Sequence, residues 1–227
     1  MPNFDLDNVT LRDVNSALHE VDMKATGDWT ISNPRGTHAL AAGVDAPLKI
    51  TIDGSVGYYC AGMNKHAEIT INGSAGVGLA ENMMSGSVRV KGDASQSAGA
   101  TAHGGLLVIE GNASARCGIS LKGANIIVKG NVGHMSCFMA QAGNLVVLGD
   151  AGDALGDSLY EAKIFVRGKV KSLGADCIEK EMTLENAKLL QSLLDAAGID
   201  DCKPEEFRRY GSARQLYNFK IDNVLAY

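Results

Sequence analysis

Residues 73–81, with the sequence GSAGVGLAE, have the composition of a loop that could hold the phosphates of a nucleotide. The apolar run Ile69-Thr70-Ile71 comes directly before them, as a strand would. Phosphate binding also needs a helix that begins inside the glycines, because the helix N-terminus supplies the amides and the dipole. After Gly78 the chain enters another turn of a repeat that contains no helix. We therefore expect a corner of the chain here and not a nucleotide site.

Two groups of residues have the chemistry of metal ligands. The spacing of Asp150, Asp153 and Asp157 matches neither an EF-hand loop nor a calcium-binding nonapeptide repeat, so these aspartates are expected in turns. His103 and His134 stand at different phases of the repeat, whereas metal ligands must converge on one point. The sequence therefore predicts no metal site.

The five cysteines are widely spread and contain no Cys-x-x-Cys pair. Small buried thiols are the expectation for such cysteines, and a reactive thiol is the alternative. No Ser-His-Asp or Cys-His pair can be proposed from sequence positions alone. We predict no catalytic residue, no cofactor and no metal in this chain.

The composition limits the class of protein. The chain has 227 residues, a formal net charge of -5 with mixed signs, and 45% hydrophobic residues without a run long enough to cross a bilayer. Nucleic acid and membranes are therefore not expected as partners. The N-terminal residues are neither basic nor apolar, which predicts a cytoplasmic protein.

A repeat of 19 residues organises most of the chain. Glycine marks each repeat at Gly54, Gly73, Gly92, Gly111, Gly130, Gly149 and Gly168. The residues four and two positions before every one of these glycines are Ile, Val or Leu, which places both on one face of a strand. Small residues recur seven and thirteen positions after the glycines, where the chain must turn. The sequence predicts an all-β fold, a right-handed parallel β-helix of about seven 19-residue coils with short flanking helices.

The repeat divides the chain into three segments: residues 1–35 as an N-terminal helix and lead-in, 36–180 as the β-helix, and 181–227 as a C-terminal helix and docking tail. The helices are expected over residues 10–20, capped by Thr10, and over 184–197. Just before the glycines, Lys91, Glu110 and Lys129 would lie side by side in a favourable order of charge.

One outward column changes from polar to apolar along the rod. Val108, Ile127, Val146 and Phe165, with Leu148 nearby, would form an exposed apolar patch unless something covers them. Two covers remain open at this point: the chain's own C-terminal helix or the surface of a partner.

The arcs between the strands are the place where contact with a neighbouring subunit or a passing small molecule would occur, because flexible and adaptable side chains gather there. Ordinary corner packing is the first expectation for these residues, and such contact is the alternative. These residues are Asn82, Met83, Met84, Arg116, Met135, Phe138 and Met139.

The repeats resemble the GXGXG domain, a β-helix that ends the large subunit of glutamate synthase and also occurs as a subunit of formylmethanofuran dehydrogenase. The resemblance covers about residues 36–180, and segments 58–64 and 207–214 make the chain most similar to the β-helix subunits of N-methylglutamate synthases. The matching motifs are Gly92-Asp93-Ala94 with Gly99 and Gly104-Gly105, Gly111-Asn112-Ala113 with Gly118 and Gly123, and Gly149-Asp150-Ala151 with Gly156.

The resemblance implies a noncatalytic scaffold in a complex that exchanges methylamine for ammonia on L-glutamate. Its partners would be an amidotransferase-like subunit and an FMN-binding, glutamate-synthase-like subunit with an iron-sulfur cluster. The alternative is the equivalent subunit of another glutamate synthase or formylmethanofuran dehydrogenase relative. An independent β-helix acyltransferase is disfavoured, because that fold repeats its aliphatic residue at every sixth position.

Overall fold

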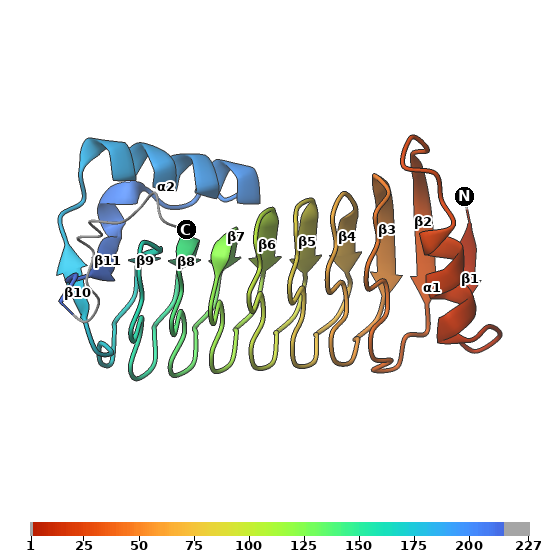
Figure 1. Ribbon diagram of the computed structural model, residues 1–227, viewed down its shortest axis with the longest axis horizontal. Coiled ribbons are helices and arrows are strands. Elements are labelled where there is room, and N and C mark those ends of the chain that lie inside the picture. Colours follow the sequence, from red (N-terminus) through yellow and green to blue (C-terminus); the bar gives the residue numbers. More distant parts are fainter. Residues whose placement is uncertain (1, 216–227) are drawn as a thin grey trace, which may run out of the picture.

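The computed structural model describes residues 2–215 and shows a rod of stacked coils with a helix at each end (Figure 1). Within that part of the chain the strands form a single 11-stranded sheet in the order β1-β2-β3-β4-β5-β6-β7-β8-β9-β11-β10. The elements are β1 (Asn3–Asp5), α1 (Leu11–His19), β2 (Gly27–Ser32), β3 (Leu48–Asp53), β4 (Glu68–Ile71), β5 (Ser87–Val90), β6 (Leu106–Ile109), β7 (Lys122–Val128), β8 (Ala142–Val147), β9 (Lys163–Val166), β10 (Cys177–Lys180), α2 (Leu184–Ala197), the 3-10 helix η1 (Pro204–Glu206) and β11 (Arg208–Ser212).

The strands from β3 to β9 are parallel and pair in the register of the repeat. Ile50 lies beside Ile69, Ile69 beside Val88, and so on, each partner 19 residues further along the chain. The two aliphatic columns predicted from the repeat point inward, and their members are at most 1% exposed. The predicted parallel β-solenoid of about seven turns is therefore confirmed.

We call the seven repeat glycines, from Gly54 to Gly168, the ladder glycines. A polar column fixes the corner directly after the first six of them. The side-chain oxygen of Ser55, Ser74, Asp93, Asn112, Asn131 or Asp150 accepts a hydrogen bond from the backbone N–H one coil further on, at 2.7 to 3.2 Å. Short polar side chains suit this position because they can bond to nearby backbone. Asp150 is thus a corner residue, in agreement with its expected turn role.

The ladder glycines are required by the close approach of successive coils. A Cβ atom added to Gly130 would lie 2.5 Å from Asn112 Oδ1 and 2.7 Å from the carbonyl oxygen of Gly111, both on the preceding coil. The same steric limit recurs at Gly92, where an added Cβ would meet the Ser74 hydroxyl at 2.5 Å. No side chain fits at this corner without displacing backbone.

The coil between β2 and β3 is longer than the 19-residue coils that follow it. Ser32 of β2 pairs with Asp53 of β3, so two additional residues are accommodated between these strands. Helix α1 lies at this end of the rod (Figure 1) and buries Val14 and Leu18 in the core. As predicted, Thr10 caps α1: its hydroxyl accepts a hydrogen bond from the Asp13 N–H at 3.2 Å.

Helix α2 covers the apolar outward column. It runs along the rod, across the strands at the C-terminal end (Figure 1). Val108, Ile127, Val146 and Phe165, each at most 1% exposed, form one buried cluster with the inner face of α2. The chain's own helix is therefore the cover, and a partner surface is not needed for it. The helix begins after Thr183 and ends at Gly198, whose φ of 70° is the left-handed cap that glycine favours.

The last strands at the C-terminal end of the rod depart from the repeat. Strand β11 inserts antiparallel between β9 and β10, so that Arg209 pairs with Phe165 on one side and with Lys180 on the other. The remaining part of the predicted docking tail, residues 216–227, lies outside the described residues, as does residue 1.

An ion network connects the sheet to α2. Glu110 accepts hydrogen bonds from Arg89 at 2.5 Å and from Lys129 at 2.7 Å, and the Lys91 ammonium lies 3.5 Å from the same carboxylate. The other side of the Arg89 guanidinium donates to the carbonyl oxygen of Ala197 at the end of α2, at 2.7 Å. The predicted Lys-Glu-Lys order is thus confirmed, with Arg89 as the link to the helix.

Replacing Glu110 with glutamine is expected to lower the free energy of unfolding by about 2 kcal/mol at neutral pH, since hydrogen bonds to a charged group are lost. Burial alone would raise the pKa of Glu110, but the hydrogen bonds from Lys129 and Arg89 outweigh it and lower the pKa from 4.5 to about 2. The carboxylate therefore contributes fully above about pH 4.5, and the contribution is lost as the pH falls toward 2. Urea unfolding of the wild type and of Glu110→Gln at several pH values measures this difference in the free energy of unfolding.

The matched control is Glu68→Gln, because Glu68 and Lys49 are 3.9 Å apart and both more than 60% exposed. This variant is expected to change the unfolding free energy by less than about 0.5 kcal/mol. A Glu110→Gln deficit that stayed constant between pH 7 and pH 2 would contradict the assignment.

Candidate functional site

The arcs that face away from α2 have an unusual backbone. Residues five, seven and nine positions after most ladder glycines take positive φ, so left-handed residues alternate with others around each bend. The middle position is filled by alanine, glycine or cysteine and is buried, whereas the outer two carry larger side chains in most coils, with Gly78 and Ala154 as the exceptions. A left-handed residue with a side chain costs on the order of 1 kcal/mol or more. Glycine would adopt this left-handed backbone at a lower cost in free energy. The presence of larger residues at these positions therefore indicates that their side chains have a role at the surface.

Four of the seven residues expected at an interface occupy these outer, left-handed positions. They are Asn82, Arg116, Met135 and Met139, with φ between 52° and 58°. Arg116 and Met139 are exposed, and Asn82 and Met135 are half-buried. The Asn82 amide oxygen accepts a hydrogen bond from the Thr101 hydroxyl on the next coil, at 2.6 Å.

The other three residues differ from one another in exposure. Met84 is 44% exposed and Phe138 is half-buried, so both reach the arcs. Met83 is fully buried in the core and has no access to a partner or a passing molecule. The structure therefore brings six of the seven to one side of the rod. Their role in contact with a partner stays a prediction.

The sequence analysis did not identify Tyr58, Tyr59 and Met63, which are large and exposed on this side, as contact residues. We give the name arc surface to Tyr58, Tyr59, Met63, Met84 and Met139, which are 38% to 54% exposed. Tyr58 stacks on the His38 ring with centroids 4.5 Å apart, and Tyr59 stands edge-on to Tyr58 at 6.4 Å. Their spacing from Gly54 gave little signal, because the equivalent positions in the other coils range from exposed, as at Arg116, to buried, as at Gly78. Tyrosine and methionine are enriched at protein interfaces.

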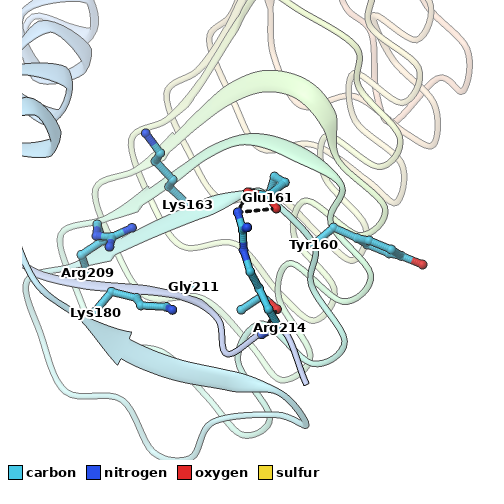
Figure 2. A pocket seen from close by; sticks show the side chains of 9 residues that line it. Tyr160, Glu161, Lys163, Lys180, Arg209, Gly211 and Arg214 are labelled. Atoms are coloured by element: carbon cyan, nitrogen blue, oxygen red, sulfur yellow. Dashed lines mark hydrogen bonds and ion pairs between the residues drawn. The ribbon is translucent and has the colours of Figure 1, made fainter. Parts of the chain in front are cut away.

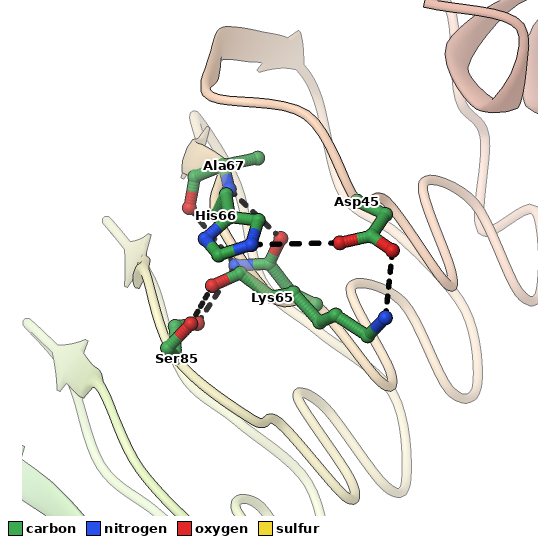
Figure 3. A network of polar contacts seen from close by, with 6 residues as sticks. Asp45, Lys65, His66, Ala67 and Ser85 are labelled. Carbon is green, nitrogen blue, oxygen red and sulfur yellow. Dashed lines mark hydrogen bonds and ion pairs between the residues drawn. The ribbon is translucent and has the colours of Figure 1, made fainter. Parts of the chain in front are cut away.

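A polar network joins three coils beside the strands (Figure 3). Asp45 Oδ2 accepts a hydrogen bond from the Lys65 ammonium at 2.6 Å, and His66 Nε2 lies 3.6 Å from Asp45 Oδ1. The Ser85 hydroxyl donates to the carbonyl oxygen of Lys65. These polar groups are directed at neighbouring coils, which identifies the network as a connection between coils.

The cysteines have the character of core residues. Burial raises the pKa of Cys60, Cys117 and Cys177 to about 12, and it also raises the pKa of Cys137 well above its usual value. Burial also raises the pKa of Cys202. Because the thiolate is the reactive form of cysteine, these side chains are poor nucleophiles at neutral pH.

Metal-ligand chemistry finds no support within residues 2–215, where no group of three His, Cys, Asp or Glu side chains is placed to hold an ion. Asp153 pairs with Lys171 at 2.7 Å, and the hydrogen bond from that ammonium lowers the pKa of the Asp153 carboxyl. Asp157 accepts hydrogen bonds from the Ser158 hydroxyl and the Ala175 N–H. Neither helix of the described chain has the length and apolar character to cross a bilayer.

Comparison with known proteins identifies a relative that matches along the full length. No model of a known protein family matches the chain. Protein GlxC of Rhizobium meliloti (strain 1021) is 62% identical over 228 residues, which is 100% of both chains. Identity at this level over the whole length implies the same fold and the same arrangement of coils and caps. The chain therefore belongs to the GlxC family.

Proposed function

We propose that this chain is the noncatalytic scaffold subunit of a glutamate-synthase-related enzyme complex, and more closely of an N-methylglutamate synthase. That complex would exchange methylamine for ammonia on L-glutamate. The scaffold role rests chiefly on the arc surface. A rod whose core is filled by its own aliphatic columns, and whose apolar outward column is covered by its own helix, still exposes Tyr59 and Met63 by half or more.

The partners in this proposal are an amidotransferase-like subunit and an FMN-binding subunit with an iron-sulfur cluster. A rigid rod is suited to holding two such subunits at a fixed separation, because each coil is hydrogen-bonded to the next throughout its length. The arc surface would contact one of them, and the adjacent Asn82, Arg116, Met135 and Phe138 would lie beside that contact.

The proposal is tested by producing the chain together with FMN-binding and amidotransferase-like proteins from its own organism. All three are expected to purify as one complex, whereas the isolated chain is expected to carry no flavin absorbance and no activity. Flavin held in equal amount by the isolated chain, or the absence of any complex, would refute the scaffold role.

The double variant Tyr59→Glu/Met63→Glu tests whether the arc surface contacts a partner subunit. We expect it to reduce recovery of the partners at least tenfold with an unchanged melting temperature, because surface substitutions of this kind alter stability by about 0.5 kcal/mol or less. Leu184→Glu is the matched control, since Leu184 is also apolar and 83% exposed but lies on α2. Equal recovery with both variants would show that the arc surface is not the contact.

A further inference from the structure

A cavity of about 300 Å³ opens between β9, β10 and β11, at the end of the rod opposite α1 (Figures 1 and 2). It has a strongly cationic lining. Lys163, Lys180, Arg209 and Arg214 contribute basic groups, and Glu161 contributes the acidic one. Figure 2 shows Lys163, Lys180 and Arg209 around one side of the cavity and the Arg214–Glu161 pair on the other.

Strand pairing places three of these basic residues on one face of the sheet, with two of them directly opposed. Lys180 and Arg209 are direct cross-strand partners in the antiparallel β10–β11 pair. Arg209 also pairs with Phe165 of β9, and Lys163 stands two residues before Phe165, on the same face. Like charges at directly opposed positions destabilise a sheet. All three side chains are half-buried, which weakens the screening of their repulsion by water.

The acidic groups nearby compensate for this charge only in part: burial lowers the pKa of the Arg209 guanidinium, and the Glu181 carboxylate, which favours its charged form, does not outweigh burial. The Glu161 carboxylate is engaged by Arg214 at 2.7 Å. Within residues 2–215, no carboxylate lies within 4 Å of the Lys163 or Lys180 ammonium groups. Arg209 Nε donates to the backbone carbonyl of Glu181 at 3.0 Å, and burial lowers the pKa of its guanidinium, as expected for a charge short of water.

The middle of the same sheet shows how this chain deals with neighbouring cations when the purpose is structural. There, Glu110 stands between Lys91 and Lys129 and contacts both. At the β9–β11–β10 junction Lys180 and Arg209 are direct partners, and no carboxylate of the described residues forms an ion pair with Lys163 or Lys180 as Glu110 does with Lys91 and Lys129. The cluster therefore has the character of a binding site, in which a ligand supplies the negative charge.

We propose that this cavity binds a small oxyanion with two negative charges, a dicarboxylate or a phosphate. The planar guanidinium of Arg209 can bind two oxygens at once, and the Lys163 and Lys180 ammonium groups add point charges from the sides. The volume is at the lower end of the range for small-molecule sites, about 300 to 1,000 Å³. The proposal does not depend on the scaffold role, and either can fail without the other.

Titration calorimetry of the full chain at low ionic strength tests the proposal, with inorganic phosphate and succinate as separate probes. The expected result is saturable binding of at least one probe. Lys180→Gln is expected to weaken that binding at least fivefold, and Lys163→Gln/Lys180→Gln at least thirtyfold. Binding of succinate alone would identify a dicarboxylate site, binding of phosphate alone a phosphate site, and binding of both a general dianion site.

Stability provides a second readout that separates ligand binding from a structural role. Because Lys180 faces Arg209, Lys180→Gln without added anion is expected to leave the melting temperature unchanged or raise it. Lys24→Gln is the matched control, since Lys24 is exposed at the opposite end of the rod, and it should alter neither binding nor melting. No binding of either probe, or equal affinity in wild type and Lys163→Gln/Lys180→Gln, would overturn the proposal.

Discussion

Gly130→Ala is expected to destabilise the protein by about 3 kcal/mol, at the upper end of the usual cost of overpacking. The added methyl group would lie 2.5 Å from Asn112 Oδ1 and 2.7 Å from the Gly111 carbonyl oxygen. Neither atom can move freely, because Asn112 Oδ1 accepts the Asn131 N–H at 2.9 Å and the Gly111 carbonyl accepts the Gly130 N–H at 2.9 Å. Urea or thermal unfolding measures the loss.

Gly36→Ala distinguishes steric overlap from backbone strain. Gly36 has a φ of 75°, and a Cβ added there would meet nothing within 4 Å. Its replacement should cost only the left-handed penalty of about 1 kcal/mol. Equal losses at Gly36 and Gly130 would show that close contact between coils is not what requires the ladder glycines.

Phe165→Ala is expected to cost about 3 to 5 kcal/mol, the usual range for truncation of a buried phenylalanine. Phe165 is fully buried and belongs to the cluster that holds α2, together with Leu190 and Leu194. Because each coil of a solenoid contacts only its neighbours, the loss should be local. Hydrogen exchange is therefore expected to accelerate in α2 and β11 and to remain slow in β3, β4 and β5.

The exposed residue at the start of the same helix provides the control. Leu184 is 83% exposed, so Leu184→Ala should leave both stability and exchange unchanged. Unaltered protection of α2 in Phe165→Ala would mean that the helix is held by contacts other than the outward column.

The repeat made most of the rod predictable. Alternation of apolar residues within each strand specifies which side chains face inward. The 19-residue spacing specifies their partners, so the pairing of Ile50 with Ile69 follows from the sequence alone. The apolar character of Ile127 and Phe165 indicated a cover but not its identity, because burial by a helix of the same chain and burial by a partner need the same residue types. Only the packing of α2 decided between them.

The features that escaped prediction depended on geometry without a sequence period. Left-handed residues alternate around the arcs, so the neighbours Met83 and Met84 face opposite ways, and neither residue type specifies which one is buried. Strand β11 has no repeat, and its insertion beside β9 brings Arg209 and Lys163 together from distant parts of the chain. The polar column from Ser55 to Asp150 was visible in the sequence and needed only to be compared across repeats.

Helix α2 packs its apolar face on β6, β7, β8 and β9 but not on β3 or β4, and it contacts β5 through the Arg89–Ala197 hydrogen bond. This divides the molecule into two halves with different tolerance to changes of length. Deleting or duplicating 19 residues between β3 and β5 would shift the distance between the two caps by about 4.8 Å and preserve every remaining pairing. The same change under α2 would displace the apolar column of the strands relative to the helix leucines that pack on it. Natural or engineered variants should therefore gain or lose whole coils in the N-terminal half, while the number of coils in the C-terminal half is fixed.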